Sequence, residues 1–156
     1  MVKVADTEAP TIDEIHDHVA ARLAALEQRY TASRRTIVGV LARVGRPLNI
    51  VELLGEVPGM PQSSAYRNLT VLADAGAVRR VAGSDDLGRF ELAEDLSGHH
   101  HHLVCEACGK VEDLTASARI EAVLDEVAAA AAEEYGYEVT EHRLDLVGRC
   151  ASCRVS

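Results

Sequence analysis

The chain has 156 residues, of which 47% are hydrophobic and only 3% aromatic, and its formal net charge is −9. This length can bury one sizeable core or two small ones, and the scarcity of aromatic rings argues against binding nucleic acid by base stacking. No run approaches the roughly 18 apolar residues of a membrane span, and the N-terminus lacks a signal-peptide pattern, so we expect a cytoplasmic protein without a membrane partner.

The charge is unevenly distributed along the chain. Residues 31–90 hold eight basic and five acidic residues, whereas residues 91–156 hold five basic and fourteen acidic ones. Because the attraction of phosphate depends on local rather than total charge, the basic middle of the chain is the candidate contact for nucleic acid.

The first predicted element is an amphipathic helix over about 11–30. Apolar residues recur there at intervals of three and four, and Thr11 with Glu14 forms a capping box at its start. His16 and His18 lie two residues apart on this helix and therefore diverge. We expect both histidines to face solvent.

Three further helices and a hairpin follow. Caps, apolar spacing and terminal glycines predict helices over about 31–45, 49–57 and 63–76. Short runs at 78–81 and 89–92 predict a β-hairpin. Helix, helix, turn, helix and hairpin is the order of a winged helix-turn-helix, with a helical hairpin carrying incidental arginines as the alternative.

In a winged helix-turn-helix, the helix after the turn enters the major groove with its N-terminal residues toward the bases. Glutamine and arginine make bidentate base contacts there, tyrosine packs on a thymine methyl, and arginines elsewhere suit phosphates. The predicted DNA contacts are Gln62, Ser63, Ser64, Tyr66, Arg67, Arg34, Arg79 and Arg80, with Arg89 as a further phosphate contact.

The hairpin turn is predicted at 83–88, and the Gly- and Ser-containing stretch 95–98 predicts a linker. The pattern changes after this point. We expect a DNA-binding domain over 1–93, a hinge over 94–98 and a second domain over 99–156.

The second domain is predicted to be a small α/β unit. Strands are expected over 100–105, 110–114 and 137–147, with an alanine-rich helix over 117–135 between the last two. His142 falls on the apolar face of the last strand, where a packed core residue is the usual case.

Four consecutive histidines, His99 to His102, run into a C-x2-C pair. On an extended strand alternate residues share a face, so His99 and His101 face one side while His100 and His102 face the other. One strand would then serve two metal sites. A solvated polar strand without metal is the alternative.

The cysteines also point to metal. In a reducing compartment, two C-x2-C pairs typically converge on a tetrahedral zinc ion. The four thiols are Cys105, Cys108, Cys150 and Cys153. A thioredoxin-like redox motif is the competing explanation, but it accounts for only one pair.

Over about residues 30–154 the chain resembles the ferric uptake regulator family of metal-sensing bacterial repressors. The resemblance rests on residues 64–69, 75–78, 89–92, 99–113 and 141–144, with the second cysteine pair following. It implies an α+β fold, with an N-terminal winged helix-turn-helix followed by a small C-terminal α/β dimerisation domain. It further implies a homodimer that binds double-stranded DNA at a palindromic operator.

The resemblance also implies three metal sites. Structural zinc would be held by Cys105, Cys108, Cys150 and Cys153. A sensory site at the hinge would use Glu91, His100, His102 and Asp113. A site within the dimerisation domain would use His99, His101, Glu121 and His142.

Two departures from the family concern the hinge site. Residues 46–48 stand where members often donate another histidine, and residues 94–96 stand where zinc-sensing members often have a cysteine. The site is therefore expected to be incomplete, oxygen-rich, or completed by His16, His18 or Glu94. The histidine run is most similar to the zinc uptake regulator branch, and nitrogen ligands suit zinc. We predict zinc as the regulatory metal, with iron, manganese or nickel as alternatives.

The predicted function is metal-dependent repression of metal-uptake genes, with no small-molecule substrate. A peroxide-sensing member of the same family is one alternative, and a zinc-ribbon module for metal storage or interaction is another. An enzyme is not expected, because no H-E-x-x-H or H-x-E pattern supplies a general base beside the histidines.

Overall fold

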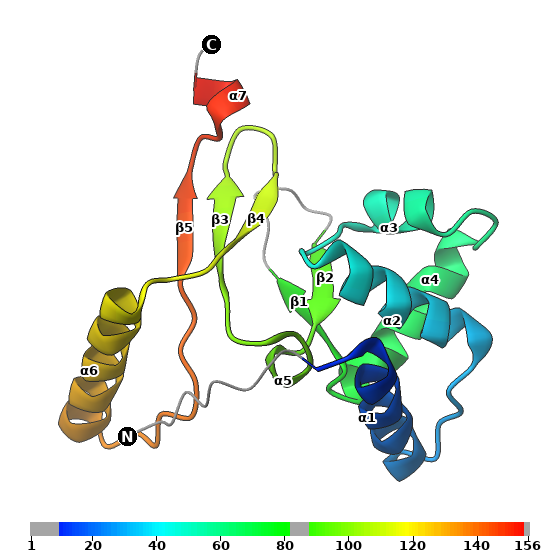
Figure 1. Ribbon diagram of the computed structural model, residues 1–156, viewed down its shortest axis with the longest axis horizontal. Helices are drawn as coiled ribbons and strands as arrows, with labels where there is room; N and C mark the ends of the chain where they lie inside the picture. The colour runs from blue at the N-terminus through cyan, green and yellow to red at the C-terminus, as the bar shows by residue number, and fades with distance from the viewer. Residues whose placement is uncertain (1–9, 82–87, 155–156) are drawn as a thin grey trace.

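A computed structural model describes residues 10–81 and 88–154, and its elements form two groups that follow each other along the chain (Figure 1). The first group consists of α1 (Ile12–Ala25), α2 (Ala32–Val44), α3 (Ile50–Glu56), α4 (Gln62–Asp74), β1 (Val78–Val81), β2 (Arg89–Leu92) and α5 (Glu94–Ser97). The second group consists of β3 (His101–Cys105), β4 (Val111–Leu114), α6 (Ala118–Tyr135), β5 (Asp145–Gly148) and α7 (Ala151–Arg154). The predicted α+β class is confirmed, while most of the predicted hairpin turn at 83–88 lies outside the described residues.

Side-chain caps determine where the first helices begin. The predicted capping box of Thr11 and Glu14 is present, and Asn49 forms a second box with Glu52 at the start of α3. These side chains accept hydrogen bonds from N–H groups that have no partner within the helix. Gly45 ends α2 in the left-handed conformation, with φ of 65°, which glycine adopts without steric cost.

The apolar faces of α1 to α4 form one core, on which the hairpin of β1 and β2 packs. Its completely buried side chains include Val19, Leu23, Ile37, Val38, Leu53 and Leu72. A backbone bridge between Leu48 and Phe90 joins the α2–α3 loop to β2, and Arg79 of β1 lies opposite Glu91 of β2 in the antiparallel register. The core therefore fixes α4 and the hairpin as one unit.

The segment predicted as a linker is mostly helical. Residues 94–97 form α5, and Leu96 is only 1% exposed within the first core. This burial docks the short helix on the first group of elements. The chain leaves that group at Gly98, where φ is 86°.

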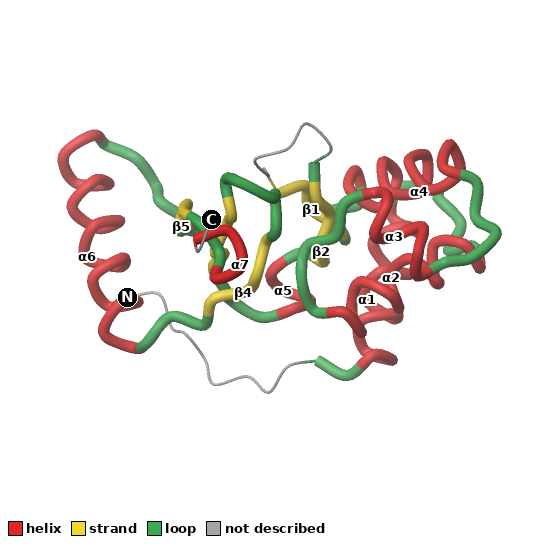
Figure 2. Tube along the Cα trace, turned by 90° about the horizontal axis from the view of Figure 1, so that it is seen from above, coloured by secondary structure: helices red, strands yellow, loops and turns green. Residues whose placement is uncertain are grey.

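The second group is built on a three-stranded sheet with β3 in the centre. Strand β3 is antiparallel to β4 and parallel to β5, so His102 has Asp113 on one side and Asp145 on the other. Helix α6 lies at the end of the molecule opposite α1–α4 (Figure 2), and none of its residues is buried. Among the described residues, no helix is both long and apolar enough to cross a membrane.

Two predictions about where elements begin or end were also wrong. Helix α1 ends at Ala25 rather than near residue 30, because the chain turns there and Glu27 takes a positive φ of 56°. The strand predicted over 137–147 forms only at Asp145–Gly148, where β3 provides a hydrogen-bonding neighbour. Alternation in the sequence did not reveal how short that neighbour is.

Candidate metal centres and nucleic-acid interface

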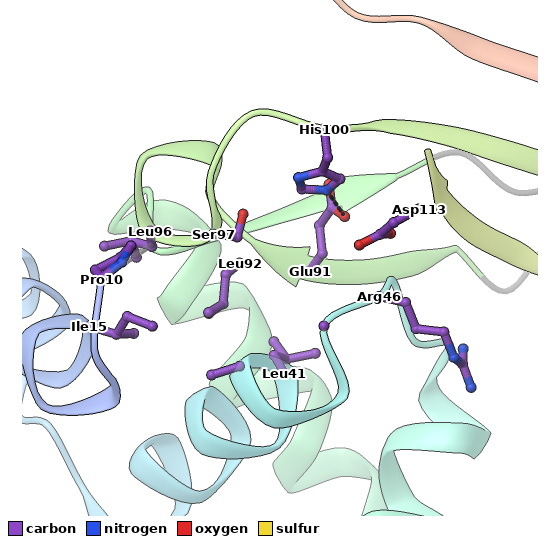
Figure 3. A pocket seen from close by; sticks show the side chains of 12 residues that line it. Pro10, Ile15, Leu41, Arg46, Glu91, Leu92, Leu96, Ser97, His100 and Asp113 are labelled. Atoms are coloured by element: carbon purple, nitrogen blue, oxygen red, sulfur yellow. Dashed lines mark hydrogen bonds and ion pairs between the residues drawn. The ribbon is translucent and has the colours of Figure 1, made fainter. Parts of the chain in front are cut away.

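The four residues predicted for the sensory site come together between the two groups, and we call them the hinge cluster. Glu91 lies on β2, His100 just before β3, His102 on β3 and Asp113 on β4. Each offers one ligand atom, and these atoms lie within 4.8 Å of one another. In Figure 3 the His100 ring points at the Glu91 carboxylate, with Asp113 beside them. Nε2 of His100 and Nε2 of His102 each lie 3.1 Å from Oε2 of Glu91.

The hinge cluster brings charged groups together although two of its four residues, Glu91 and His102, are buried. Burial opposes ionisation of Glu91, which is 4% exposed, but hydrogen bonds from His100, His102 and Arg79 lower its pKa. The Glu91 carboxylate in turn raises the pKa of His100 to about 9. For His102, burial lowers the pKa, yet its bonds to Glu91 and Asp145 outweigh this and raise it. A buried carboxylate requires positive partners, and this set of nitrogen and oxygen donors suits a divalent cation.

The structure shows what stands at the places where the family often has further ligands. Nη1 of Arg46 lies 3.0 Å from Oε1 of Glu52, and its side chain points away from His100 in Figure 3. Glu94 contacts His99 rather than the hinge cluster. Within the described residues the hinge cluster therefore has two nitrogen and two carboxylate donors.

The histidines of helix α1 do not join this cluster. Contrary to expectation, His16 is buried, with Nδ1 2.6 Å from the Tyr30 hydroxyl. His18 is exposed, as predicted. The expectation for His16 was wrong because the segment after α1 folds back and brings Tyr30 to it, a contact that helical periodicity does not reveal.

A second set, here called the imidazole cluster, forms on the other face of β3. It consists of His99, His101, Glu121 and His142, whose ligand atoms also lie within 4.8 Å of one another. Nε2 of His99 is 3.1 Å from Nε2 of His142, and Nε2 of His101 is 3.0 Å from Oε1 of Glu121. The predicted period of two thus separates the histidines into two clusters. His142 faces this cluster rather than an apolar core.

The four cysteines lie at the far end of the sheet. Cys105 ends β3, Cys108 follows in the turn, and Cys150 and Cys153 border or lie on α7. All four are thiols rather than disulfides. Sγ of Cys108 and Sγ of Cys150 are 3.8 Å apart, close to the edge of about 3.8 Å expected for a tetrahedron with zinc–sulfur bonds of about 2.3 Å. Backbone N–H groups of Cys150 and Cys108 lower the pKa of Cys105 to about 6, which favours the thiolate.

The candidate DNA-reading surface is the N-terminal part of α4. Gln62, Ser63, Tyr66 and Arg67 are exposed there and Ser64 is half-buried, while Ala65, Leu69 and Leu72 face the core. The predicted side chains therefore lie on the outward face of the helix. The structure agrees with this placement, and DNA contact itself stays a prediction.

The predicted phosphate contacts differ from one another in position. Arg80 is exposed. Arg34 is half-buried, and its Nε donates to Oδ1 of Asn68 at 3.2 Å, across to α4. Arg79 is turned inward to Glu91 and Glu94. Arg89 is only 3% exposed, with Nη1 2.9 Å from Oε2 of Glu52. Arg79 and Arg89 are thus occupied by carboxylates instead of facing the solvent, which corrects their prediction.

Sequence reasoning missed Asp145 and Asp125, which stand behind two of the histidines, and considered Glu94 only as a ligand of the hinge site. Oδ1 of Asp145 is 3.0 Å from Nδ1 of His102, Oδ1 of Asp125 is 3.7 Å from Nδ1 of His142, and Glu94 bonds Nδ1 of His99. Such partners orient imidazole ligands and fix which ring nitrogen carries the proton. They are common acidic residues whose role depends entirely on the fold.

Comparison with known proteins gives a consistent result. The model of the Ferric uptake regulator family matches residues 25–147. The Peroxide operon regulator of Bacillus subtilis (strain 168) is 35% identical over 101 residues, which are 65% of this chain and 64% of that protein. The peroxide-responsive repressor PerR of Staphylococcus aureus (strain USA300) is 28% identical over 151 residues, 92% of this chain and 96% of that protein.

Among solved structures, the Helicobacter pylori ferric uptake regulator Fur superposes with a TM-score of 0.76. The identity is 24%, and the match covers 96% of this chain and 98% of that one. At this identity the likeness establishes the fold alone. The match to the Bacillus subtilis relative spans less than two thirds of that relative's length.

Proposed function

The chain belongs to the ferric uptake regulator family, and on that premise we propose that it is a homodimeric regulator that binds a palindromic operator when divalent metal occupies its hinge. The observation that carries the proposal is the composition of the hinge cluster. Glu91 comes from the hairpin of the DNA-binding half, whereas His100, His102 and Asp113 come from the sheet of the other half. Members of this family are transcriptional regulators, which agrees with the expectation that the histidines do not form an enzyme's active site.

The proposed mechanism is a shift between orientations of the two halves. A divalent ion would supply one positive centre shared by donors from both sides of the hinge. Glu91 then holds the hairpin against His100 and His102, and Gly98 is the point about which the orientation changes. Metal regulates only if it binds the DNA-competent orientation more tightly, and moving from about 1% to 99% requires a preference of roughly 10⁴-fold. We retain 1–93, 94–98 and 99–156 as the proposed domains, with α5 docked on the first.

The cysteine cluster is proposed to hold structural zinc. Four thiols at knuckle spacing, with one sulfur pair at the edge length of a zinc tetrahedron, support this assignment. Cys150 and Cys153 lie about 40 residues along the chain from Cys108. Zinc there would join the end of β3 to the C-terminal segment and stabilise the sheet.

The homodimer is supported by the surface of the second half. Helix α6 and strand β5 expose large apolar side chains, namely Ile120, Val123, Val127, Leu146 and Val147. A single chain leaves these side chains in water, and such patches mark association surfaces. A second copy of the chain would cover α6 and place two recognition helices side by side on one operator.

The regulatory signal has two candidates. The nitrogen donors of the imidazole cluster favour zinc, and Arg79 occupies Oε1 of Glu91, which leaves one oxygen for a metal. A low coordination number also suits zinc. The names of the Bacillus subtilis and Staphylococcus aureus relatives instead favour a response to peroxide. The mixed donors of the hinge cluster also suit iron or manganese. The names of these relatives support a response to peroxide better than a response to zinc.

DNA binding tests the proposed function. Metal-loaded protein is used to select duplexes from a random pool, and fluorescence anisotropy then measures their affinity with metal and after mild chelation. We expect enrichment of a palindrome and tight binding only with metal. Equal affinity in both states contradicts the proposal.

The two signals are separated by the same assay after exposure to hydrogen peroxide. If the protein responds to peroxide, the iron-loaded form loses DNA binding irreversibly while the zinc-loaded form keeps it. If it responds to zinc, DNA binding follows free zinc in the physiological range, and peroxide has no effect at the hinge. Elemental analysis of untagged protein identifies the metal it carries.

A further inference from the structure

Arg79 lies between carboxylates of two different elements. It is on β1, its side chain is 16% exposed, and its Nε donates to Oε1 of Glu91 on the neighbouring strand. Its Nη1 also lies 3.6 Å from Oε2 of Glu94, at the start of α5. A guanidinium presents several donors in a rigid plane, so one side chain can hold two carboxylates in fixed positions.

Glu94 continues this chain of contacts to the imidazole cluster. Its Oε1 bonds Nδ1 of His99, and the same ring turns Nε2 toward His142 at 3.1 Å and toward Glu121 at 3.2 Å. Nδ1 of His99 is thus held by Glu94 of the DNA-binding half, while Nε2 of the same ring is a ligand atom of the imidazole cluster. Side chains connect the two clusters without a break, through Glu91, Arg79, Glu94 and His99.

We propose that Arg79 and Glu94 are positioning residues that couple the two clusters, so that metal in the imidazole cluster raises the affinity of the hinge cluster for metal. This inference rests on the proposed function, because it requires both clusters to bind metal. It assigns the imidazole cluster a part in regulation through the hairpin of the DNA-binding half.

The coupling is expected to be positive, because an ion in one cluster orders side chains that the other cluster also uses. When His99 is fixed with Nε2 toward the imidazole cluster, its Nδ1 is fixed toward Glu94. Glu94 then fixes Arg79, and Arg79 fixes Glu91 with Oε2 toward His100 and His102. The second ion therefore meets donors that are already ordered and loses less conformational entropy on binding, which gives positive cooperativity. By linkage, metal in the hinge cluster raises the affinity of the imidazole cluster by the same factor.

The test is a thermodynamic cycle on the full-length protein with its cysteine zinc retained. Zn²⁺ is titrated against a chromophoric chelator into the wild type, into Asp113→Ala with a disabled hinge cluster, and into His142→Ala with a disabled imidazole cluster. If the clusters are coupled, the product of the two wild-type association constants exceeds the product of the two single-site constants by about fivefold or more.

The same three measurements are repeated in the Arg79→Gln and Glu94→Gln backgrounds. We expect the two products to agree within about twofold in each, because either change breaks the chain of contacts. A direct effect of the substitution on the affinity of one cluster changes both products of association constants equally, so the comparison removes it. Glu94→Gln provides the same test if Arg79→Gln fails to fold. Arg43→Gln, which removes an exposed ion pair with Glu56, is the matched control and should keep the coupling.

Equal products in the wild type, or an excess that survives both Arg79→Gln and Glu94→Gln, would overturn the inference. In that case two ions still bind and the proposed function stands. If the wild type binds no zinc beyond that held by the cysteines, the proposed function fails, and the coupling fails with it.

Discussion

Two separate tasks, contact with DNA and ligation of metal, are proposed for the side chains of this molecule. Arg67 is exposed on the outward face of α4, and the structure assigns it no role in either metal cluster. We expect Arg67→Ala to weaken operator binding by about 1–3 kcal/mol, measured by fluorescence anisotropy, with zinc content unchanged. Arg43→Ala removes an exposed arginine of α2 and serves as control. Equal effects of the two changes would mean that α4 does not read DNA.

Glu52 makes the stability of the first group of elements sensitive to acid. Partial burial opposes ionisation, but the backbone N–H of Asn49 and the guanidinium groups of Arg46 and Arg89 outweigh it and lower the pKa of Glu52. A lowered pKa stabilises the fold above the unfolded value of about 4.3, and this contribution is lost as pH falls through the folded value. We expect Glu52→Gln to cost about 1 kcal/mol at pH 7 and progressively less below pH 4, measured by urea unfolding. A cost that does not shrink in acid contradicts this assignment.

For single residues, the sequence indicated the candidate metal ligands but not the side chains that hold those ligands in place. Alternation along one strand was enough to divide His99 to His102 between two faces, because a strand has a fixed period of two. The roles of Arg79, Glu94 and Asp145 depend on contacts between elements far apart in the chain. Their residue types are as common on an ordinary surface, so composition and spacing do not reveal them.

Among the elements, α5 decides where the two halves separate. Its Leu96 is buried in the first core at 1% exposure, so Leu96→Ala leaves a cavity. We expect a loss of about 2–5 kcal/mol in unfolding free energy for the DNA-binding half, measured by thermal or urea denaturation. Val51→Ala on α3, where the side chain is 65% exposed, should change stability little. If Leu96→Ala is as mild as Val51→Ala, α5 is not docked and the hinge is longer than proposed.

Elements with strong local signals were predicted well, and those that depend on a neighbour were not. Capping boxes and terminal glycines placed the starts and ends of several helices because these motifs act within one turn. The short α5 has no such signal, and its Ser97 with the following Gly98 suggested a linker. The length of β5 is set by β3, which pairs with it only from Asp145 to Gly148.

In the whole molecule, α6 is the longest of the described elements in which a single chain buries no residue. We expect Val127→Asp, on a side chain that is 59% exposed, to shift the protein to a monomer in analytical ultracentrifugation, because a dimer would bury a charge without a partner. Val51→Asp places the same charge on an equally exposed apolar site of α3 and should leave the assembly unchanged. A dimer that tolerates Val127→Asp places the interface elsewhere.

The order of the elements in the first half of the chain could be predicted, apart from α5, because the winged helix-turn-helix has a distinctive sequence of helices and strands. The exposure of α6 could not, since its apolar stripe looks the same whether it packs within the chain or against a second copy. Likewise, the charge of the middle third indicated a basic surface but not that Arg79 and Arg89 would turn inward.

Control of DNA binding by metal in the hinge cluster can be tested by comparing the wild type with a variant that lacks the two hinge histidines. Fluorescence anisotropy gives the operator affinity of the wild type and of the His100→Ala/His102→Ala double variant, each with metal and after mild chelation, with cysteine zinc verified in both. We predict that metal raises the operator affinity of the wild type by about 5- to 150-fold. The affinity of the double variant stays low with and without metal. Equal gains from metal in the two proteins would contradict the claim.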